Sequence, residues 1–86
     1  LNGDAGADKI DLKAINMSAN GGAGNDTITA AQTGATISGG DDIDTLVLKN
    51  TGTANGGNGN DIITASKAAV LNGDAGNDSI TGSAFN

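Results

Sequence analysis

The chain has 86 residues, 15 of them glycine, and contains no proline, cysteine, histidine, tyrosine or tryptophan. All ten acidic residues are aspartate, only four lysines oppose them, and the formal net charge is −6. This balance argues against nucleic acid and anionic membranes as partners, because both need basic contacts. No apolar run approaches the roughly 18 residues of a membrane span. We therefore expect no membrane insertion. We also expect no enzyme activity, because without histidine, cysteine or glutamate there is no general base poised near neutrality.

A glycine-rich turn that ends in an aspartate recurs along the whole chain. Its five copies are Gly3–Asp8, Gly21–Asp26, Gly39–Asp44, Gly56–Asp61 and Gly73–Asp78, and their first glycines are 18, 18, 17 and 17 residues apart. A fixed period of this size is typical of a solenoid. We therefore expect one repeat segment over residues 1–86, with five coils of about 17–18 residues.

Two short strands are predicted in each coil. After each aspartate, aliphatic or small residues stand two and four positions on, which is the period-2 alternation of a strand with one face inward. The first position holds Ile10, Ile28, Leu46, Ile63 and Ile80, and the second holds Leu12, Ala30, Leu48, Ala65 and Gly82. A return limb carries Leu1, Ala19, Ile37, Ala54 and Leu71 two positions before the next first glycine. These rows predict two facing strand layers with a thin core between them.

The glycine-rich turns themselves predict a cation site. Glycine serves where the backbone needs a positive φ or a close approach, and in four of the five copies the final aspartate stands two positions after the last glycine. Hard cations such as Ca²⁺ take six to eight oxygens from carboxylates and backbone carbonyls. The exclusive use of the short aspartate side chain suits a ligand that reaches back to its own loop. The sequence therefore predicts calcium loops.

The phrasing of these repeats resembles a known family. Asn25-Asp26-Thr27-Ile28-Thr29 and Asn77-Asp78-Ser79-Ile80-Thr81, with the glycines before them, are similar to the G-G-x-G-x-D-x-U-x motif of RTX calcium-binding proteins. The resemblance covers nearly all of the chain and implies an all-β, right-handed parallel β-roll, or β-solenoid. The commonest members place two motifs in each coil, whereas here only one half of each coil carries the motif. We therefore expect a calcium ladder along a single edge.

The resemblance also implies a set of ligands. Each ion would lie between two successive loops, held by their aspartates and by main-chain carbonyls from the first four loop positions. The aspartates would be Asp8, Asp26, Asp44, Asp61 and Asp78, paired in that order. The carbonyls would belong to residues such as Gly21, Gly22, Ala23, Gly24, Gly39, Gly40, Asp41, Asp42, Gly56, Gly57, Asn58 and Gly59.

The third loop departs from the motif, because Asp42 replaces its third glycine and Ile43 stands where asparagine is usual. We expect the two sites that share Asp44 to be altered or weaker. Aspartate adopts the left-handed conformation more readily than most residues, so Asp42 can fit there and lend an oxygen. Asp4 and Asp74 replace the second glycine of their loops, and add charge to the end sites or are merely solvated.

Two alternatives remain open at this point. The Asn-Gly pairs that begin at Asn2, Asn20, Asn55 and Asn72 favour hairpin turns and hence an antiparallel meander, although a hairpin does not explain the Gly-x-Asp that follows. The many threonines raise an ice-binding function, but related ice-binding solenoids place threonine between the second and third glycines. This chain has Ala5, Ala23, Asp41, Asn58 and Ala75 there.

The resemblance implies a calcium-stabilised structural module of a secreted or cell-surface protein, such as a surface layer, adhesin or extracellular fibre. It would stay unfolded until calcium is met after export, which in this family typically uses a C-terminal signal for type I secretion. The alternative is a C-terminal calcium-binding domain of a secreted enzyme or cytotoxin. Leu1-Asn2 opens in mid-repeat, so we expect a longer parent chain. Lys13, Lys49 and Lys67 should lie opposite the aspartates, and self-association end to end or laterally is the predicted partnership.

Overall fold

The computed structural model describes residues 3, 5–66 and 69–82, and the chain in these ranges forms nine strands and no helix. The strands are β1 (Lys9–Leu12), β2 (Ser18–Asn20), β3 (Thr27–Ala30), β4 (Ala35–Gly40), β5 (Thr45–Leu48), β6 (Gly52–Gly57), β7 (Ile62–Ala65), β8 (Ala69–Asn72) and β9 (Ser79–Gly82). The strands that follow the aspartates and the strands of the return limb both lie where the alternation predicts them.

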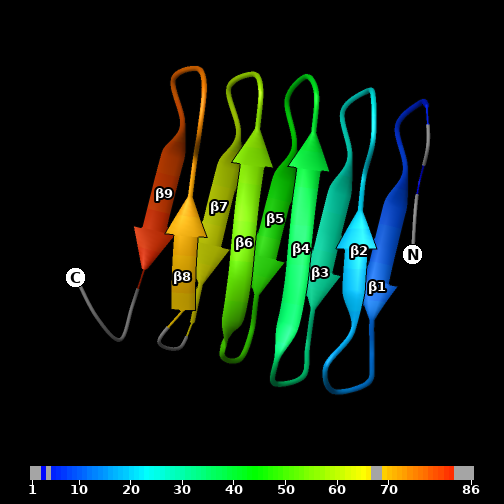
Figure 1. Cartoon of the computed structure of the whole chain (residues 1–86), viewed down its shortest axis with the longest axis vertical. Helices are drawn as coiled ribbons and strands as arrows, with labels where there is room; N and C mark the ends of the chain where they lie inside the picture. Colours follow the sequence, from blue (N-terminus) through cyan, green and yellow to red (C-terminus); the bar gives the residue numbers. More distant parts are fainter. Residues whose placement is uncertain (1–2, 4, 67–68, 83–86) are drawn as a thin grey trace.

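The strands separate into two parallel sheets, one of odd-numbered and one of even-numbered strands (Figure 1). Their orders are β1-β3-β5-β7-β9 and β2-β4-β6-β8, and every neighbouring pair is parallel. The predicted β-solenoid is therefore confirmed, and the antiparallel meander is wrong, because the turn after Asn20 links strands of different sheets. Five loops are present as expected, but the described strands complete about four turns rather than five.

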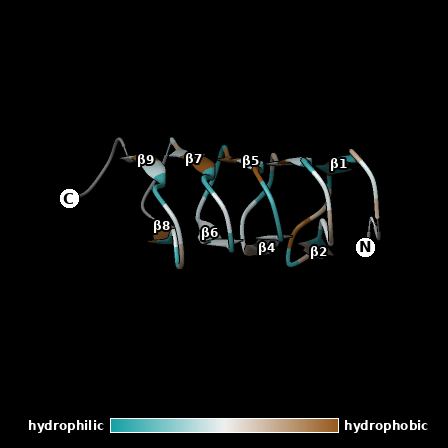
Figure 2. Ribbon diagram, turned by 90° about the horizontal axis from the view of Figure 1, so that it is seen from above, coloured by the Kyte–Doolittle hydropathy of each residue, from teal (hydrophilic) through white to brown (hydrophobic). Residues whose placement is uncertain are grey.

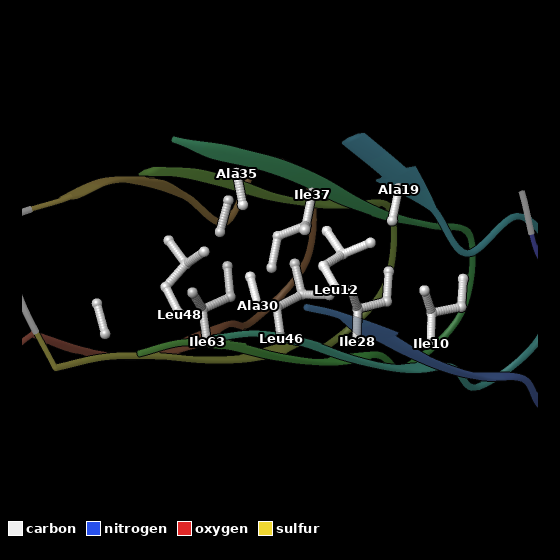
Figure 3. Close-up of a cluster of buried hydrophobic side chains, with 12 residues drawn as sticks. Ile10, Leu12, Ala19, Ile28, Ala30, Ala35, Ile37, Leu46, Leu48 and Ile63 are labelled. Carbon is white, nitrogen blue, oxygen red and sulfur yellow. The ribbon is translucent and has the colours of Figure 1, made fainter. Parts of the chain in front are cut away.

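The two sheets lie as separate layers, seen edge-on in Figure 2, with a thin apolar core between them. The parallel register aligns identical motif positions, so that Ile10, Ile28, Leu46 and Ile63 form one continuous row. Figure 3 shows these side chains pointing toward the alanines and Ile37 of the opposite sheet. The remaining core residues are Leu12, Ala19, Ala30, Ala35, Leu48, Ala54 and Ala65, with Met17, Ala69 and Leu71 packed against them. The inward rows are thus largely confirmed, while Leu1 lies outside the described residues.

Ile80 is the exception in the inward row. It is in register with Ile63 but 46 % exposed, because among the described residues no strand of the opposite sheet follows β9 to cover it. Ile10, on the other end strand of the same sheet, is only 9 % exposed, because β2 follows β1 in the opposite sheet.

The edge opposite the aspartate loops is held by backbone contacts between loops of unequal length. Residues 31–34 link β3 to β4, whereas only residues 49–51 link β5 to β6. The Asn16 amide donates to the Thr33 carbonyl at 3.0 Å, and the Gly34 amide donates to that of Thr51 at 2.9 Å. The change of period from 18 to 17 residues occurs at this edge, because β5 pairs with residues of β3 that lie 18 positions earlier, whereas β6 pairs with residues of β4 that lie 17 positions earlier.

Charged side chains also differ between the two edges. Lys13 and Lys49 are exposed on the loops opposite the aspartates, as expected, and Lys67 lies outside the described residues. Over the part of the chain that the structure describes, no helix is long and apolar enough to cross a membrane.

Candidate metal centre

The five glycine-rich loops lie side by side along a single edge, at the top of Figure 1. Backbone hydrogen bonds join them in register: the Gly21 amide donates to the Ser38 carbonyl at 2.8 Å, and the Thr27 amide donates to that of Asp8 at 2.8 Å. Loops separated by one period are thereby brought into contact.

The aspartates of successive loops form a continuous file. The backbone amide of each aspartate donates to Oδ1 of the aspartate one coil later, so that each carboxylate braces the preceding loop. The links are Asp8 to Asp26 at 2.9 Å, Asp26 to Asp44 at 2.8 Å, Asp44 to Asp61 at 2.9 Å and Asp61 to Asp78 at 2.9 Å. Every pair of aspartates predicted to share an ion is therefore in direct contact.

The second oxygen of these carboxylates has no partner. Oδ2 of Asp8, Asp26, Asp44 and Asp61 is buried without a hydrogen bond, and the last three side chains are at most 1 % exposed. Buried polar atoms are almost always paired, and an unpaired carboxylate oxygen is more costly than a neutral group. Four such atoms in one file indicate a missing positively charged partner.

The first glycine of each loop makes room for this oxygen. A methyl group at Gly21 would lie 2.5 Å from Oδ2 of Asp26 and 2.7 Å from the carbonyl oxygen of Gly39. A methyl at Gly3 would likewise lie 2.6 Å from Oδ2 of Asp8 and 2.8 Å from the Gly21 carbonyl oxygen. An aspartate oxygen thus lies beside each first glycine, and at Gly3 and Gly21 a carbonyl oxygen of the next loop converges with it. An all-oxygen donor set of this kind suits a hard cation such as Ca²⁺.

Charge is poorly tolerated at Asp44 and Asp61 when no cation is present. Burial is the main reason that the pKa of Asp44 rises to about 7, and the neighbouring charges of Asp61 and Asp26 add to it, whereas the hydrogen bond from the Asp26 backbone opposes it. Burial likewise raises the pKa of Asp61. A cation between the loops would favour the charged carboxylates and reverse this effect.

The third loop accommodates its unusual residues by new contacts. Asp42 has a φ of 73°, so the left-handed conformation expected of it is confirmed. Its Oδ2 accepts a hydrogen bond from the Gly24 amide at 3.0 Å, and Oδ1 of Asn25 accepts one from the Ile43 amide at 2.9 Å. Asp42 does lend an oxygen, but to a backbone amide of the second loop. No motif or spacing in the sequence points to this link.

The remaining predicted positions lie in the loops as expected. The carbonyls of Gly22 and Gly40 each accept one bond from the next loop, from the Asp41 amide at 3.1 Å and the Asn58 amide at 3.0 Å, which leaves each carbonyl a second lone pair. Asp74 is exposed at a φ of 65°, and Asp4 lies outside the described residues. Within the described ranges no group of three or more histidine, cysteine or acidic side chains is placed to hold a metal. A site between these loops would therefore depend largely on backbone carbonyls.

The fold and the loops together define a parallel β-solenoid with acidic turns along one edge. A family model for the RTX calcium-binding nonapeptide repeat, in four copies, matches residues 18–46, 52–69 and 67–84. These matches cover more than half of the chain, which therefore belongs to the RTX calcium-binding repeat family. The resemblance drawn from the loops is confirmed, and Ca²⁺ is the ion that these repeats bind. No curated protein and no solved structure matches the chain.

The residues fit this ion, and each has a separate role in holding it. Asp8, Asp26, Asp44 and Asp61 would offer Oδ2, and in the last three the Oδ1 atom accepts a backbone amide that fixes the orientation of the carboxylate. The carbonyls of the adjacent glycines would complete the shell. Bound calcium would supply the positive charge that the buried file lacks. The assignment of individual ligands stays a prediction.

Proposed function

We propose that the chain is a calcium-stabilised structural module of a secreted or cell-surface protein, unfolded without calcium and folded after export. The observation that carries the proposal is the file of four buried carboxylate oxygens without partners. A module of this kind would form a rigid rod segment in a surface layer, an adhesin or an extracellular fibre. Membership of a calcium-binding repeat family supports the ion, and the repeated loop supports a structural role.

Like charges in the file oppose folding when calcium is absent. Neighbouring strands of a sheet lie about 4.8 Å apart, and two unit charges at that distance repel by about 3 kcal/mol at an effective dielectric constant of about 20. The core that must offset this repulsion consists only of aliphatic side chains, several of them alanine. Removal of calcium would therefore be sufficient to unfold so thin a structure.

Calcium supplies both the missing charge and a free energy of binding that only the folded chain receives. At a tenfold excess over its dissociation constant, each ion stabilises the fold by about 1.4 kcal/mol. Extracellular calcium modules have dissociation constants of roughly 0.1 to 1 mM. Sites in this range would stay empty inside a cell and fill outside it, which couples folding to export.

Circular dichroism of the 86-residue chain tests this proposal. With a chelator we expect a disordered spectrum, and with millimolar Ca²⁺ a β spectrum that Mg²⁺ at equal concentration does not restore, since Mg²⁺ demands near-ideal octahedral geometry. Asp26→Ala should raise the calcium midpoint, whereas Lys13→Ala, on the opposite edge, should not. A β signal that is unchanged by chelation would overturn the calcium switch.

A further inference from the structure

We propose that Asp42 and Asn25 clasp the second loop (Gly21–Asp26) to the third (Gly39–Asp44) before calcium arrives, so that this interval folds and binds calcium first. The inference rests on the proposed calcium-dependent folding and adds an order of events to it. It also predicts different calcium midpoints for the two sites that share Asp44, which the sequence motif alone does not distinguish.

The clasp consists of two hydrogen bonds that run in opposite directions between the loops. The Gly24 amide of the second loop donates to Oδ2 of Asp42 in the third, at 3.0 Å. The Ile43 amide of the third loop donates to Oδ1 of Asn25 in the second, at 2.9 Å. Both acceptors are side chains on the outer surface of the turns, apart from the buried Oδ2 file. The clasp therefore needs no ion.

The next interval lacks an equivalent among the described residues. Ile43 occupies in the third loop the position that Asn25 occupies in the second, and its side chain cannot accept a bond from the fourth loop (Gly56–Asp61). In this part of the chain, the third and fourth loops share only one side-chain contact of this outer kind, from Nδ2 of Asn58 to Oδ1 of Asp41 at 3.2 Å. The substitutions in the third loop thus strengthen its contact with the loop before it and weaken that with the loop after it.

The two outer pairs of loops also lack a clasp of two hydrogen bonds. In the first loop the position of Asn25 is held by Ala7, which has no side-chain acceptor. Between the fourth and fifth loops, Oδ1 of Asn60 accepts from the Asn77 amide at 2.8 Å, which is a single link. Over the described ranges, only the second and third loops have two side-chain-to-backbone links beyond the aspartate file.

Holding two loops together before the ion binds lowers the calcium needed to fill the site between them. The apparent affinity of a site rises with the fraction of molecules in which its two halves are already assembled. A clasp of two exposed hydrogen bonds should lower the calcium midpoint of its interval by roughly three- to tenfold relative to the neighbouring interval.

Two backbone amides report on the two intervals under matched conditions. The Thr45 amide donates to the Asp26 carbonyl across the clasped interval, and the Ile62 amide donates to the Asp44 carbonyl across the next, both at 2.8 Å. They occupy the same motif position. In a calcium titration of the 86-residue chain followed by NMR, Thr45 should reach its folded chemical shift at roughly three- to tenfold less calcium than Ile62.

Asp42→Gly is the decisive variant, and Asp74→Gly is its matched control. Both replace an aspartate of positive φ by glycine, so both relieve backbone strain and remove one exposed charge, but only Asp42 accepts a bond from another loop in the described chain. Asp42→Gly should raise the Thr45 midpoint to that of Ile62, and Asp74→Gly should leave the difference intact. Asn25→Ala, which removes the other half of the clasp, should reduce the difference partially.

The outcomes separate this inference from the calcium switch. Equal midpoints for Thr45 and Ile62 in the unmodified chain, or equal effects of Asp42→Gly and Asp74→Gly, would overturn the clasp while leaving calcium-driven folding intact. If the chain is already folded in chelator, the switch fails, and hydrogen exchange still tests the clasp: slower exchange at Thr45 than at Ile62 supports it and equal rates overturn it. A chain that never folds at any calcium concentration overturns both.

Discussion

The backbone amide of Asp26 donates a 2.8 Å hydrogen bond to Oδ1 of Asp44, while Oδ2 of Asp44 stays buried without a partner. One carboxylate oxygen thus braces the preceding coil, and the other is the one that we propose to face a cation. Because the bracing bond fixes the side chain, the cation-facing oxygen is positioned by the fold itself. Folding and calcium binding therefore depend on the same residue.

Asp44→Asn should uncouple the two roles. The amide keeps an acceptor for the Asp26 backbone and removes the buried charge, so the calcium-free chain should gain structure. The loss of a charged ligand should raise the calcium midpoint by about tenfold, equivalent to about 1.4 kcal/mol. Circular dichroism at fixed calcium concentrations measures both effects. Asp11→Asn on the exposed face of β1 is the control, and identical titrations for the two variants would contradict the assignment.

Acidification should partly replace calcium. The pKa of Asp44 is raised from 3.8 to about 7 in the folded chain, and that of Asp61 is raised as well. A raised pKa means that the folded state binds protons more tightly, so this stabilisation is complete below pH about 3.8 and is lost as the pH rises through about 7. In chelator, the β signal should therefore increase as the pH falls from about 7 to 4. Asp44→Asn should flatten this profile, and a signal that decreases over the same range would refute burial of the Asp44 charge as the cause.

Acid should also weaken calcium binding, because protons compete for the same carboxylates. For a chain that is folded before it binds, the calcium midpoint should rise as the pH is lowered below about 7, the pKa of Asp44 in the folded state, whereas for an unfolded chain it should rise only as the pH approaches 3.8. Calorimetric titrations at two pH values, in buffers of different ionisation enthalpy, would detect the protons released on binding. A calcium-free chain that is unfolded, with the pKa of Asp44 at 3.8, should release no protons near neutral pH, whereas proton release would show that binding starts from a folded chain in which Asp44 is protonated.

Gly6 and Gly24 form a natural pair for testing how closely the loops approach. Their φ angles are 102° and 101°, so alanine is equally strained at both, at a cost of roughly 1–2 kcal/mol. A methyl group at Gly6 would meet nothing within 4 Å, whereas one at Gly24 would lie 2.5 Å from the Gly6 carbonyl oxygen. Gly24→Ala should therefore be clearly more destabilising in calcium-loaded urea unfolding. Equal losses would show that the loops can separate without cost.

Ile62 and Ile63 test the thin core in the same way. They are neighbours in β7, with exposures of 48 % and 0 %. Ile63→Ala should destabilise the calcium-loaded chain by about 2–5 kcal/mol, because it removes a buried side chain from the continuous row. Ile62→Ala should change the stability by at most about 0.5 kcal/mol. Thermal unfolding in excess calcium provides the comparison, and similar melting temperatures for the two variants would mean that the ions alone hold the sheets together.

The repeat made most of the architecture predictable from the sequence. Alternation around Ile28 and Ile37 set the inward faces, and the fixed spacing of Asp26 and Asp44 placed their loops on one edge. Each of these features depends on local pattern and period, which a solenoid converts directly into spatial neighbours. The end position of Ile80 was not predictable, since its burial depends on a neighbouring strand rather than on its own coil.

The hydrogen bonds within the candidate site were harder to foresee. The family pattern shows which aspartates face each other, but not that Oδ1 of Asp44 would accept the Asp26 amide and leave Oδ2 alone. The contact of Asp42 with the Gly24 amide depends on a side-chain rotamer in a left-handed turn, which no spacing rule specifies. Sequence periodicity predicts which residues meet, whereas side-chain geometry decides which of their atoms are used.

The unequal loops on the edge opposite the aspartates have a consequence for how this architecture can diversify. Residues 31–34 and 49–51 differ in length while the strands on either side keep their register. Insertions or foreign peptides grafted at this margin would leave the ion-facing turns undisturbed. One edge of the solenoid is thus constrained by calcium binding, whereas the opposite edge can accept changes in loop length and sequence.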